Sequence, residues 1–520
     1  MANEPQPEHP HVNPWIIATA VMLSTFMEVL DTTVVNVSLP HIAGNLSATP
    51  DEATWALTSY LVANAIILPI TGWLGNYFGR KRLLMLSVTF FTAASFLCGL
   101  APNLPALIFF RIMQGASGGC LQPISQAVLL EAFKPEDRGK AMGFWGLGIV
   151  VAPMLGPVLG GWLTDSYSWR WVFYINVPIG IASLIMTRAF IFDPPYIRRG
   201  TARVDYWGIG MLAVGVGALQ LVLDKGQEKD WFSTHWVAAL TVLALTSLAA
   251  FVVYELRVKS PVVNLRVLKN RTFSSGVFLM TMLGFVLYGS LVLLPLFLQT
   301  LLGYPALQAG FAMAPRGLGS FIAMPLVGII IARFDSRKLL AFGIVVCAFT
   351  LWQLSRLSLV AGYWDIFWPQ FIQGLSLAFL FVPLTTTTMD PIPKEQMGNA
   401  TSIFNLMRNL GGSMGIAGSA TMSERWRQGD INVLGANFNP YDYGSHEMMQ
   451  RLQQGFMAQG SDPATALNRA YAATFGLVQR QAAMLSYNKV FLVLAALFLV
   501  MVPFLFLMGR PGSGKAVIVH

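Results

Sequence analysis

Long apolar runs separated by short polar stretches dominate the pattern along this 520-residue chain. A run of about 20 apolar residues crosses the ~30 Å hydrocarbon core of a bilayer as an α-helix. The alternation over about ten residues that is typical of membrane barrels does not occur. The pattern predicts fourteen membrane-spanning helices at residues 14–36, 52–75, 83–101, 105–131, 139–163, 170–191, 205–223, 234–254, 273–301, 306–332, 339–357, 365–389, 397–422 and 488–509.

Composition agrees with this interpretation. Hydrophobic residues make up 55% of the chain and charged residues only 11%, whereas about a quarter of the residues in soluble domains are charged. The mean hydropathy is +0.57. We therefore predict an all-α integral membrane protein.

Lys and Arg gather in alternate loops, which predicts the orientation because cytoplasmic loops retain these residues. Fourteen spans leave both termini on one side, predicted to be the cytoplasm. The net charge of +9 then reflects topology rather than nucleic-acid binding. The predicted inner loops contain Arg80, Lys81, Arg82, Lys134, Arg138, Lys140, Arg198, Arg199, Arg203, Arg257, Lys259, Arg266, Lys269, Arg271, Arg333, Arg337 and Lys338.

A weak internal repeat divides the chain into halves. GWLGNYFGRKRLL (72–84) matches GIIIARFDSRKLL (328–340), RIMQG (111–115) matches QFIQG (370–374), and KPEDRGKAM (134–142) matches IPKEQMGNA (392–400). Two six-helix bundles that rock about a central site are a transporter architecture. The predicted divisions are a tail at 1–13, a bundle at 14–191, an inserted pair at 192–254, a bundle at 255–509 with a long outer loop at 423–487, and a tail at 510–520.

Several motifs resemble those of the major facilitator superfamily. These are GWLGNYFGRKR after the second span, RIMQGASGG in the fourth and GIVVAPMLGPVLGG (148–161) in the fifth. LDTTVVNVSLP (30–40) and NLMRNLGGSMG (405–415) resemble the fourteen-helix drug:proton antiporter family of the EmrB/QacA type. The resemblance implies a two-bundle fold in the bacterial inner membrane that exports varied hydrophobic or amphiphilic compounds in exchange for protons, without a cofactor.

The loop motif supplies Gly72, Gly79 and Arg80 as expected gating residues. One position departs from the family pattern, because Asn76 stands where the motif usually has an acid. The resemblance implies conformational locking through that acid, and Asn76 cannot supply the negative charge that this role requires.

Two acids, Glu28 and Asp31, lie deep in the first span. Positions i and i+3 share one helix face, and an ionised acid facing lipid is costly, so we expect both to face a wet cavity. Burial and mutual repulsion oppose the charged form, which makes Asp31, with Glu28 beside it, the candidate for proton coupling. The alternative is a permanent structural ion pair with an arginine.

Arg111 is the candidate partner. Arg111, Gln114, Gly118, Gln122 and Ser125 form one polar stripe on the fourth span, as their helical spacing predicts. The resemblance implies that Arg111 takes part in proton movement; the alternative is a packed structural arginine. The candidate residues for a substrate cavity are Gln114, Gln122, Gln126, Gln373 and Asn405.

Arg316 in the tenth span and Arg408 in the thirteenth are further candidates for gating. In the fifth span, small residues permit close helix contact and prolines permit a bend. We expect this helix to form a pliable contact between the halves. The residues concerned are Gly148, Pro153, Gly156, Pro157, Gly160 and Gly161.

The stretch 423–487 is predicted to contain two helices, the second capped by Asp462 before Pro463. A long ordered outer segment favours a docking platform, and the resemblance implies a periplasmic membrane-fusion adaptor and, through it, an outer-membrane channel. A lid over the outer vestibule is the alternative.

Other functions are weakly supported by the sequence. GRPGSGKA (509–516) resembles a phosphate-binding loop but lacks the Ser or Thr and the strand of that motif. The histidines lie in tails and loops, so neither an enzyme nor a metal site is expected. An exporter of one natural metabolite and a proton-coupled importer remain as alternatives to multidrug export.

Overall fold

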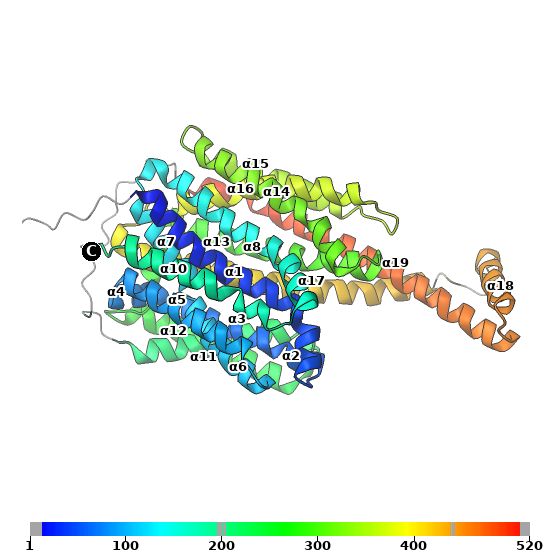
Figure 1. Cartoon of the computed structure of the whole chain (residues 1–520). Helices are drawn as coiled ribbons and strands as arrows, with labels where there is room; N and C mark the ends of the chain where they lie inside the picture. Colours follow the sequence, from blue (N-terminus) through cyan, green and yellow to red (C-terminus); the bar gives the residue numbers. More distant parts are fainter. Residues whose placement is uncertain (1–12, 195–199, 201–203, 437, 439–441, 510–520) are drawn as a thin grey trace, which may run out of the picture.

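The computed structural model describes residues 13–194, 200, 204–436, 438 and 442–509. Within these residues every regular element is helical, and the long helices run roughly parallel (Figure 1). The predicted tails (1–13 and 510–520), the phosphate-loop-like segment and the basic residues Arg198, Arg199 and Arg203 lie largely or wholly outside the described residues.

The first half contains α1 to α10. The predicted second span is divided into several short helices, and the fourth into two at Gly119 and Cys120. The helices are α1 (Pro14–Asn45), α2 (Pro50–Ala53), α3 (Trp55–Ile67), α4 (Thr71–Phe78), α5 (Arg80–Gly99), α6 (Leu104–Gly118), α7 (Leu121–Ala132), α8 (Arg138–Ser166), α9 (Trp171–Tyr174) and α10 (Asn176–Phe190).

The second half repeats this order after an inserted pair. The pair is α11 (Tyr206–Lys225) and α12 (His235–Arg257). The repeat comprises α13 (Arg271–Leu296), α14 (Ala306–Ile330), α15 (Ser336–Leu354), α16 (Tyr363–Met389), α17 (Met397–Ala436) and α19 (Pro463–Val500), with α18 (Tyr443–Ala458) between the last two.

The same helix pairs pack together in both halves. In the first half α1 contacts α8, α3 contacts α6, and α5 contacts α10; in the second half the matching pairs are α13 with α17, α14 with α16, and α15 with α19. The halves meet where α8 contacts α14 and where α17 contacts α4 and α7. Since α11 contacts both α3 and α17, the inserted pair lies beside both bundles.

Thirteen helices among the described residues are long and apolar enough to cross a membrane. The predicted span at 397–422, within α17, is not among them, because Gly, Ser, Thr, Asn and Arg occupy its buried face. Helix α17 packs against α13 and α19 of its own half and against α4 and α7 of the other half. With α17 counted, the described helices provide the fourteen predicted spans.

The segment 423–487 is mostly helix. Both α17 and α19 continue past their predicted boundaries at 422 and 488, and Figure 1 shows them extending from one end of the molecule, with α18 at the tip. The predicted cap is present, since the Asp462 side chain accepts a hydrogen bond from Thr465 N at 3.1 Å, with Pro463 beginning the helix. We call this end of the molecule the projecting end, and the opposite end, where α1 begins, the terminal end.

Candidate functional site

Asp31 lies at the centre of the first bundle and is fully buried (0% exposed). Its Oδ2 accepts a hydrogen bond from Arg111 Nη1 at 2.6 Å, and its Oδ1 accepts from Gln114 Nε2 at 2.9 Å and Asn176 Nδ2 at 2.7 Å. Helices α1, α6 and α10 therefore supply one enclosed network. In this structure three polar side chains, rather than a described cavity, surround the Asp31 carboxylate.

Arg111 is held at a fixed orientation. Its Nε donates to the Ala56 carbonyl at 3.0 Å, Nη1 also donates to Gln114 Oε1 at 2.7 Å, and the guanidinium lies 4.1 Å from the Tyr60 ring centroid. A planar guanidinium can make these directional contacts together. The geometry places an ion pair at the position of the candidate coupling acid, as both proton coupling and a permanent structural pair require.

Glu28 occupies a different network, one helical turn away on α1. Its Oε1 accepts from Asn64 Nδ2 at 3.2 Å, and its Oε2 accepts from Gln122 Nε2 at 2.5 Å. Gln122 Oε1 in turn accepts a hydrogen bond from Arg408 Nη2 of α17. Glu28 is thus linked through one amide to an arginine of the second bundle.

A second contact crosses the same interface, where Asn405 Nδ2 donates to Gln126 Oε1 at 2.6 Å. The five candidate cavity residues are therefore not in one place. Gln114 belongs with Asp31, Gln122 and Gln126 with Asn405 at the interface, and Gln373 lies in the second bundle beside Gln370 and Cys347.

The terminal end is closed by tight contact. Gly72 of α4 lies so near α17 that an added Cβ would be 2.6 Å from Asn399 Cα and 2.8 Å from Gly398 C. Gly79 has φ +88° between α4 and α5, where a side chain would be strained. Asn76 is exposed, and Arg80 forms its ion pair with Glu131 at 2.6 Å.

The glycines of α8 required a correction. Gly148, Gly156 and Gly160 pack against α1 of the same bundle, and at Gly161 no atom of the described residues lies within 4 Å of an added Cβ. The contact with the second half is made mainly by Gly139, Gly143 and Gly146, which face Met324 of α14 or Ile331 directly after it. Of the predicted residues, Pro157 also faces α14, because its Cβ lies 3.9 Å from a Cβ added at Gly310. Helix α8 continues through Pro153 and Pro157. Which neighbouring helix a given glycine contacts is decided by tertiary packing, and the composition of the helix does not specify it.

Sequence reasoning missed Tyr60, Asn64 and Asn176, although each contacts one of the two acid networks. Their polarity could have identified two of them from the sequence, because Asn64 and Asn176 are amides within predicted spans that are mostly apolar. A buried amide needs hydrogen-bond partners, so these positions were candidates for the same networks.

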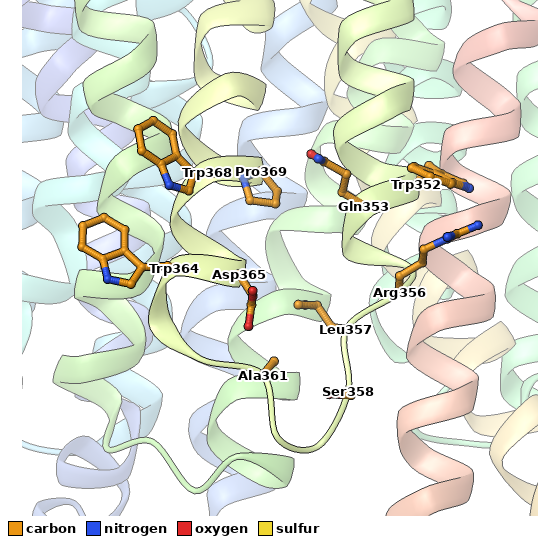
Figure 2. Close-up of a pocket in the computed structure, with 10 residues that line it drawn as sticks. All are labelled: Trp352, Gln353, Arg356, Leu357, Ser358, Ala361, Trp364, Asp365, Trp368 and Pro369. Atoms are coloured by element: carbon orange, nitrogen blue, oxygen red, sulfur yellow. The ribbon is translucent and has the colours of Figure 1, made fainter.

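A cavity of about 50 Å³ lies between the halves, lined mainly by apolar residues of α8, α13, α14 and α16 together with Arg408. A larger cavity of about 600 Å³ lies away from both acids, at the projecting end between α15 and α16. Figure 2 shows Trp352 and Arg356 on one side of it and Trp364 and Trp368 on the other. Exposed tryptophans of this kind are typical of the membrane interface.

Two helical bundles with buried charges at their interface define a secondary transporter. The chain belongs to the Major Facilitator Superfamily, whose family model matches residues 21–416. The resemblance drawn from the sequence motifs is therefore confirmed, and membership places the chain among transporters rather than enzymes.

Among its relatives, the multidrug export protein EmrB of Escherichia coli K12 is 36% identical over 96% of both chains. The fatty acid resistance protein FarB of Neisseria gonorrhoeae is 38% identical over 95% of this chain and 96% of its own. The crystal structure of the human organic anion transporter MFSD10 has the same fold, with a TM-score of 0.60 at 13% identity, covering 95% of this chain and all of the other.

Proposed function

We propose that this protein exports structurally varied hydrophobic or amphiphilic compounds across a bacterial inner membrane in exchange for protons. Relatives named for multidrug export align over nearly the whole chain. The buried acid networks of α1 supply groups that can bind protons, and the two bundles supply parts that can move. The observation that carries the proposal is the ion pair between Asp31 and Arg111 inside the bundle core.

Proton coupling follows from the cost of breaking this pair. A proton on Asp31 removes the carboxylate charge and with it the Coulomb attraction to the Arg111 guanidinium, which stays protonated. Arg111 retains its bonds to Ala56 and Gln114, so it stays in place while Asp31 is released. Loading and unloading protons then alternately loosens and tightens the contact between α1 and α6.

The Glu28 network carries the change to the second bundle. Ionised Glu28 orients the Gln122 amide so that its carbonyl oxygen faces Arg408. Protonation of Glu28 removes one acceptor and weakens this orientation. In the proposal the link between bundles opens as Glu28 protonates, and this couples proton binding to the rocking of the halves.

The decisive experiment measures protons released by purified protein in weakly buffered detergent when lipophilic compounds are added. Wild-type protein is expected to release protons, while Asp31→Asn is expected to bind the compounds without release. Glu28→Gln is expected to reduce the release. Asp165→Asn is the matched control, because Asp165 is an exposed acid outside both networks.

Release that persists in Asp31→Asn would remove Asp31 from proton coupling and favour a structural ion pair. Uptake rather than release would favour binding of proton and compound together, as an importer requires. Proton release on addition of only one of the compounds would favour a dedicated exporter.

We place the terminal end in the cytoplasm, supported by the basic residues at that end, such as Arg80, Lys81 and Arg82. The projecting end then lies in the periplasm. A reporter that is active only in the cytoplasm, fused after His520, is expected to be active; an inactive fusion would reverse the orientation.

We further propose that the projection formed by α17, α18 and α19 docks a periplasmic membrane-fusion adaptor, and through it an outer-membrane channel. Leu467, Tyr471 and Phe475 recur every four residues on α19 and are 37%, 54% and 54% exposed. Contiguous exposed apolar side chains mark interaction surfaces. The alternative, a lid, requires this segment to fold back over the bundles.

Replacing Tyr471 and Phe475 by Ser is expected to abolish co-purification with the adaptor while leaving proton release intact. The control replaces two exposed apolar residues of α12, Val242 and Leu245. Loss of proton release together with adaptor binding would instead support the lid.

A further inference from the structure

Arg316 on α14 is a buried cation without a counter-ion. Only 6% of it is exposed, and it forms no ion pair with any residue that the structure describes. Its Nη2 atom is enclosed without a hydrogen-bond partner. A buried charge is costly unless it is paired, so this position calls for an explanation that packing does not provide.

The surroundings of Arg316 are polar but carry no acid. The Cys347 thiol of α15 is the ionisable neighbour that interacts with its charge, and Cys347 itself contacts Gln373 at 3.9 Å. Gln370 donates to Gln373 at 3.3 Å, while Gln370 Oε1 is buried without a partner. The site therefore contains one fixed cation and amides whose hydrogen bonds are incompletely satisfied.

Comparison of the two halves through the internal repeat shows that, among the described residues, the second bundle lacks an acid to pair with its buried arginine. Gln370 and Gln373 match Arg111 and Gln114 of the first bundle in the repeat RIMQG and QFIQG. There the guanidinium is neutralised by Asp31, whereas the second bundle has an arginine without the acid. The buried positions in the middle of the spans hold three arginines, Arg111, Arg316 and Arg408, and two acids, Glu28 and Asp31. The interior therefore has an excess of positive charge.

We propose that Arg316 is the binding residue for the anionic group of an amphiphilic substrate, in particular a carboxylate. This rests on the proposed export function and specifies a substrate class for it. Carboxylates pair with guanidinium through two parallel hydrogen bonds. An incoming anion supplies the missing counter-ion.

The apolar part of such a substrate has a place beside this site. On α14, Ser320 and Met324 follow Arg316 at intervals of four residues, and on α16, Leu377 and Phe381 follow Gln373 on the same face. Met324, Leu377 and Phe381 line the apolar cavity between the halves. The cavity of about 50 Å³ must widen as the bundles rock, after which the substrate's chain enters it with the carboxylate at Arg316.

The test measures binding of dodecanoate and of dodecylammonium, which have equal chain lengths and opposite charges, to protein in lipid nanodiscs without a proton gradient. The rise in melting temperature on adding ligand measures binding. All variants are compared at the same ligand concentration, so the fraction of ligand that partitions into the lipid is the same for each. Arg316→Gln is expected to weaken dodecanoate binding about tenfold or more, the loss of a charge-assisted hydrogen bond, and to leave dodecylammonium unaffected or tighter. Arg316→Lys keeps the positive charge but not the two parallel hydrogen bonds, so its dodecanoate binding is expected to lie between those of wild type and Arg316→Gln.

Arg356→Gln is the matched control, because Arg356 is an exposed arginine of the same bundle. Without ligand, Arg316→Gln is expected to melt at a higher temperature than wild type, since it removes an unpaired buried charge; a structurally required arginine would give a lower melting temperature.

The proposal is overturned if wild type does not bind dodecanoate, if Arg316→Gln weakens both ligands equally, or if chloride alone gives the same Arg316-dependent stabilisation, which would indicate a small inorganic anion. Because binding is measured without proton coupling, failure of this test leaves the proton-release experiment intact, and failure of coupling leaves the binding result interpretable.

Discussion

Asp31 and Arg111 show how a charge is kept inside a membrane protein. Every partner of the Asp31 carboxylate comes from a polar side chain on α6 or α10, and neither Asp31 nor Arg111 is exposed. Removing one member of a buried pair leaves the other uncompensated, whereas removing both restores neutrality.

We therefore expect Arg111→Gln to lower the free energy of unfolding by about 3–5 kcal/mol, the typical cost of breaking a buried pair. The double variant Arg111→Gln/Asp31→Asn is expected to regain much of that loss. Thermal unfolding of the purified variants measures both. Losses that simply add would mean that the two residues are energetically independent.

At the scale of helices, α17 and α19 are the elements that depart most from the predicted boundaries, because both continue beyond the apolar stretch. The projecting part of α19 begins at Asp462, whose side chain caps the helix. Hydrogen bonds from Thr465 to the Asp462 carboxylate lower its pKa below the usual value of 3.8. The cap is therefore stabilising when Asp462 is ionised.

Asp462→Ala is expected to speed hydrogen exchange of the first-turn amides of α19 at neutral pH, measured by mass spectrometry, while Asp462→Asn keeps the cap. A lowered native pKa means that stability is present above the unfolded value and is lost as the pH falls through the native value. Below about pH 3.8 the wild type should lose first-turn protection progressively, and Asp462→Asn should not. Equal behaviour of the two proteins in acid would contradict a role for the charge.

For the whole molecule, the terminal end depends on direct backbone contact between α4 and α17 at Gly72. Glycine permits this approach because it lacks a Cβ. The state described is one in which the halves are closed at this end, and α8 contacts α14 through glycines in the same way. Rocking must separate these contacts.

Gly72→Ala is expected to hold the terminal end open, since its Cβ would collide with the Asn399 backbone. With a cysteine introduced at Thr401, which is fully buried, labelling by a membrane-impermeant maleimide from that side should rise several-fold and transport should fall. Gly161→Ala is the control, because in the part of the chain that the structure describes no atom lies within 4 Å of its added Cβ. Unchanged labelling in Gly72→Ala would show that the contact does not govern closure.

The membrane class, the number of spans, the repeat and the family resemblance could all be predicted from the chain's local patterns. They follow from the length of the apolar runs, from the Lys and Arg residues in the loops between spans, and from the spacing of the motifs. All of these are local properties of the chain. The sequence also identified Asp31, Arg111 and the helices of the projecting segment. The low apolar content of α17 did not hide it, because its motif and its place in the repeat marked it.

The hydrogen-bond and ion-pair partners of the buried groups could not be predicted in this way, because they come together only when the helices pack. Arg111 and Asn176 lie 80 and 145 positions from Asp31, and no local pattern specifies such pairs. Packing also turned Gly148, Gly156 and Gly160 of α8 toward α1 and placed Gln122 between Glu28 and Arg408. It left Arg316 without an acidic partner among the described residues. Helix formation depends on neighbours along the chain, whereas the facing of each helix and the neutralisation of each buried charge depend on residues that meet only when the bundles assemble.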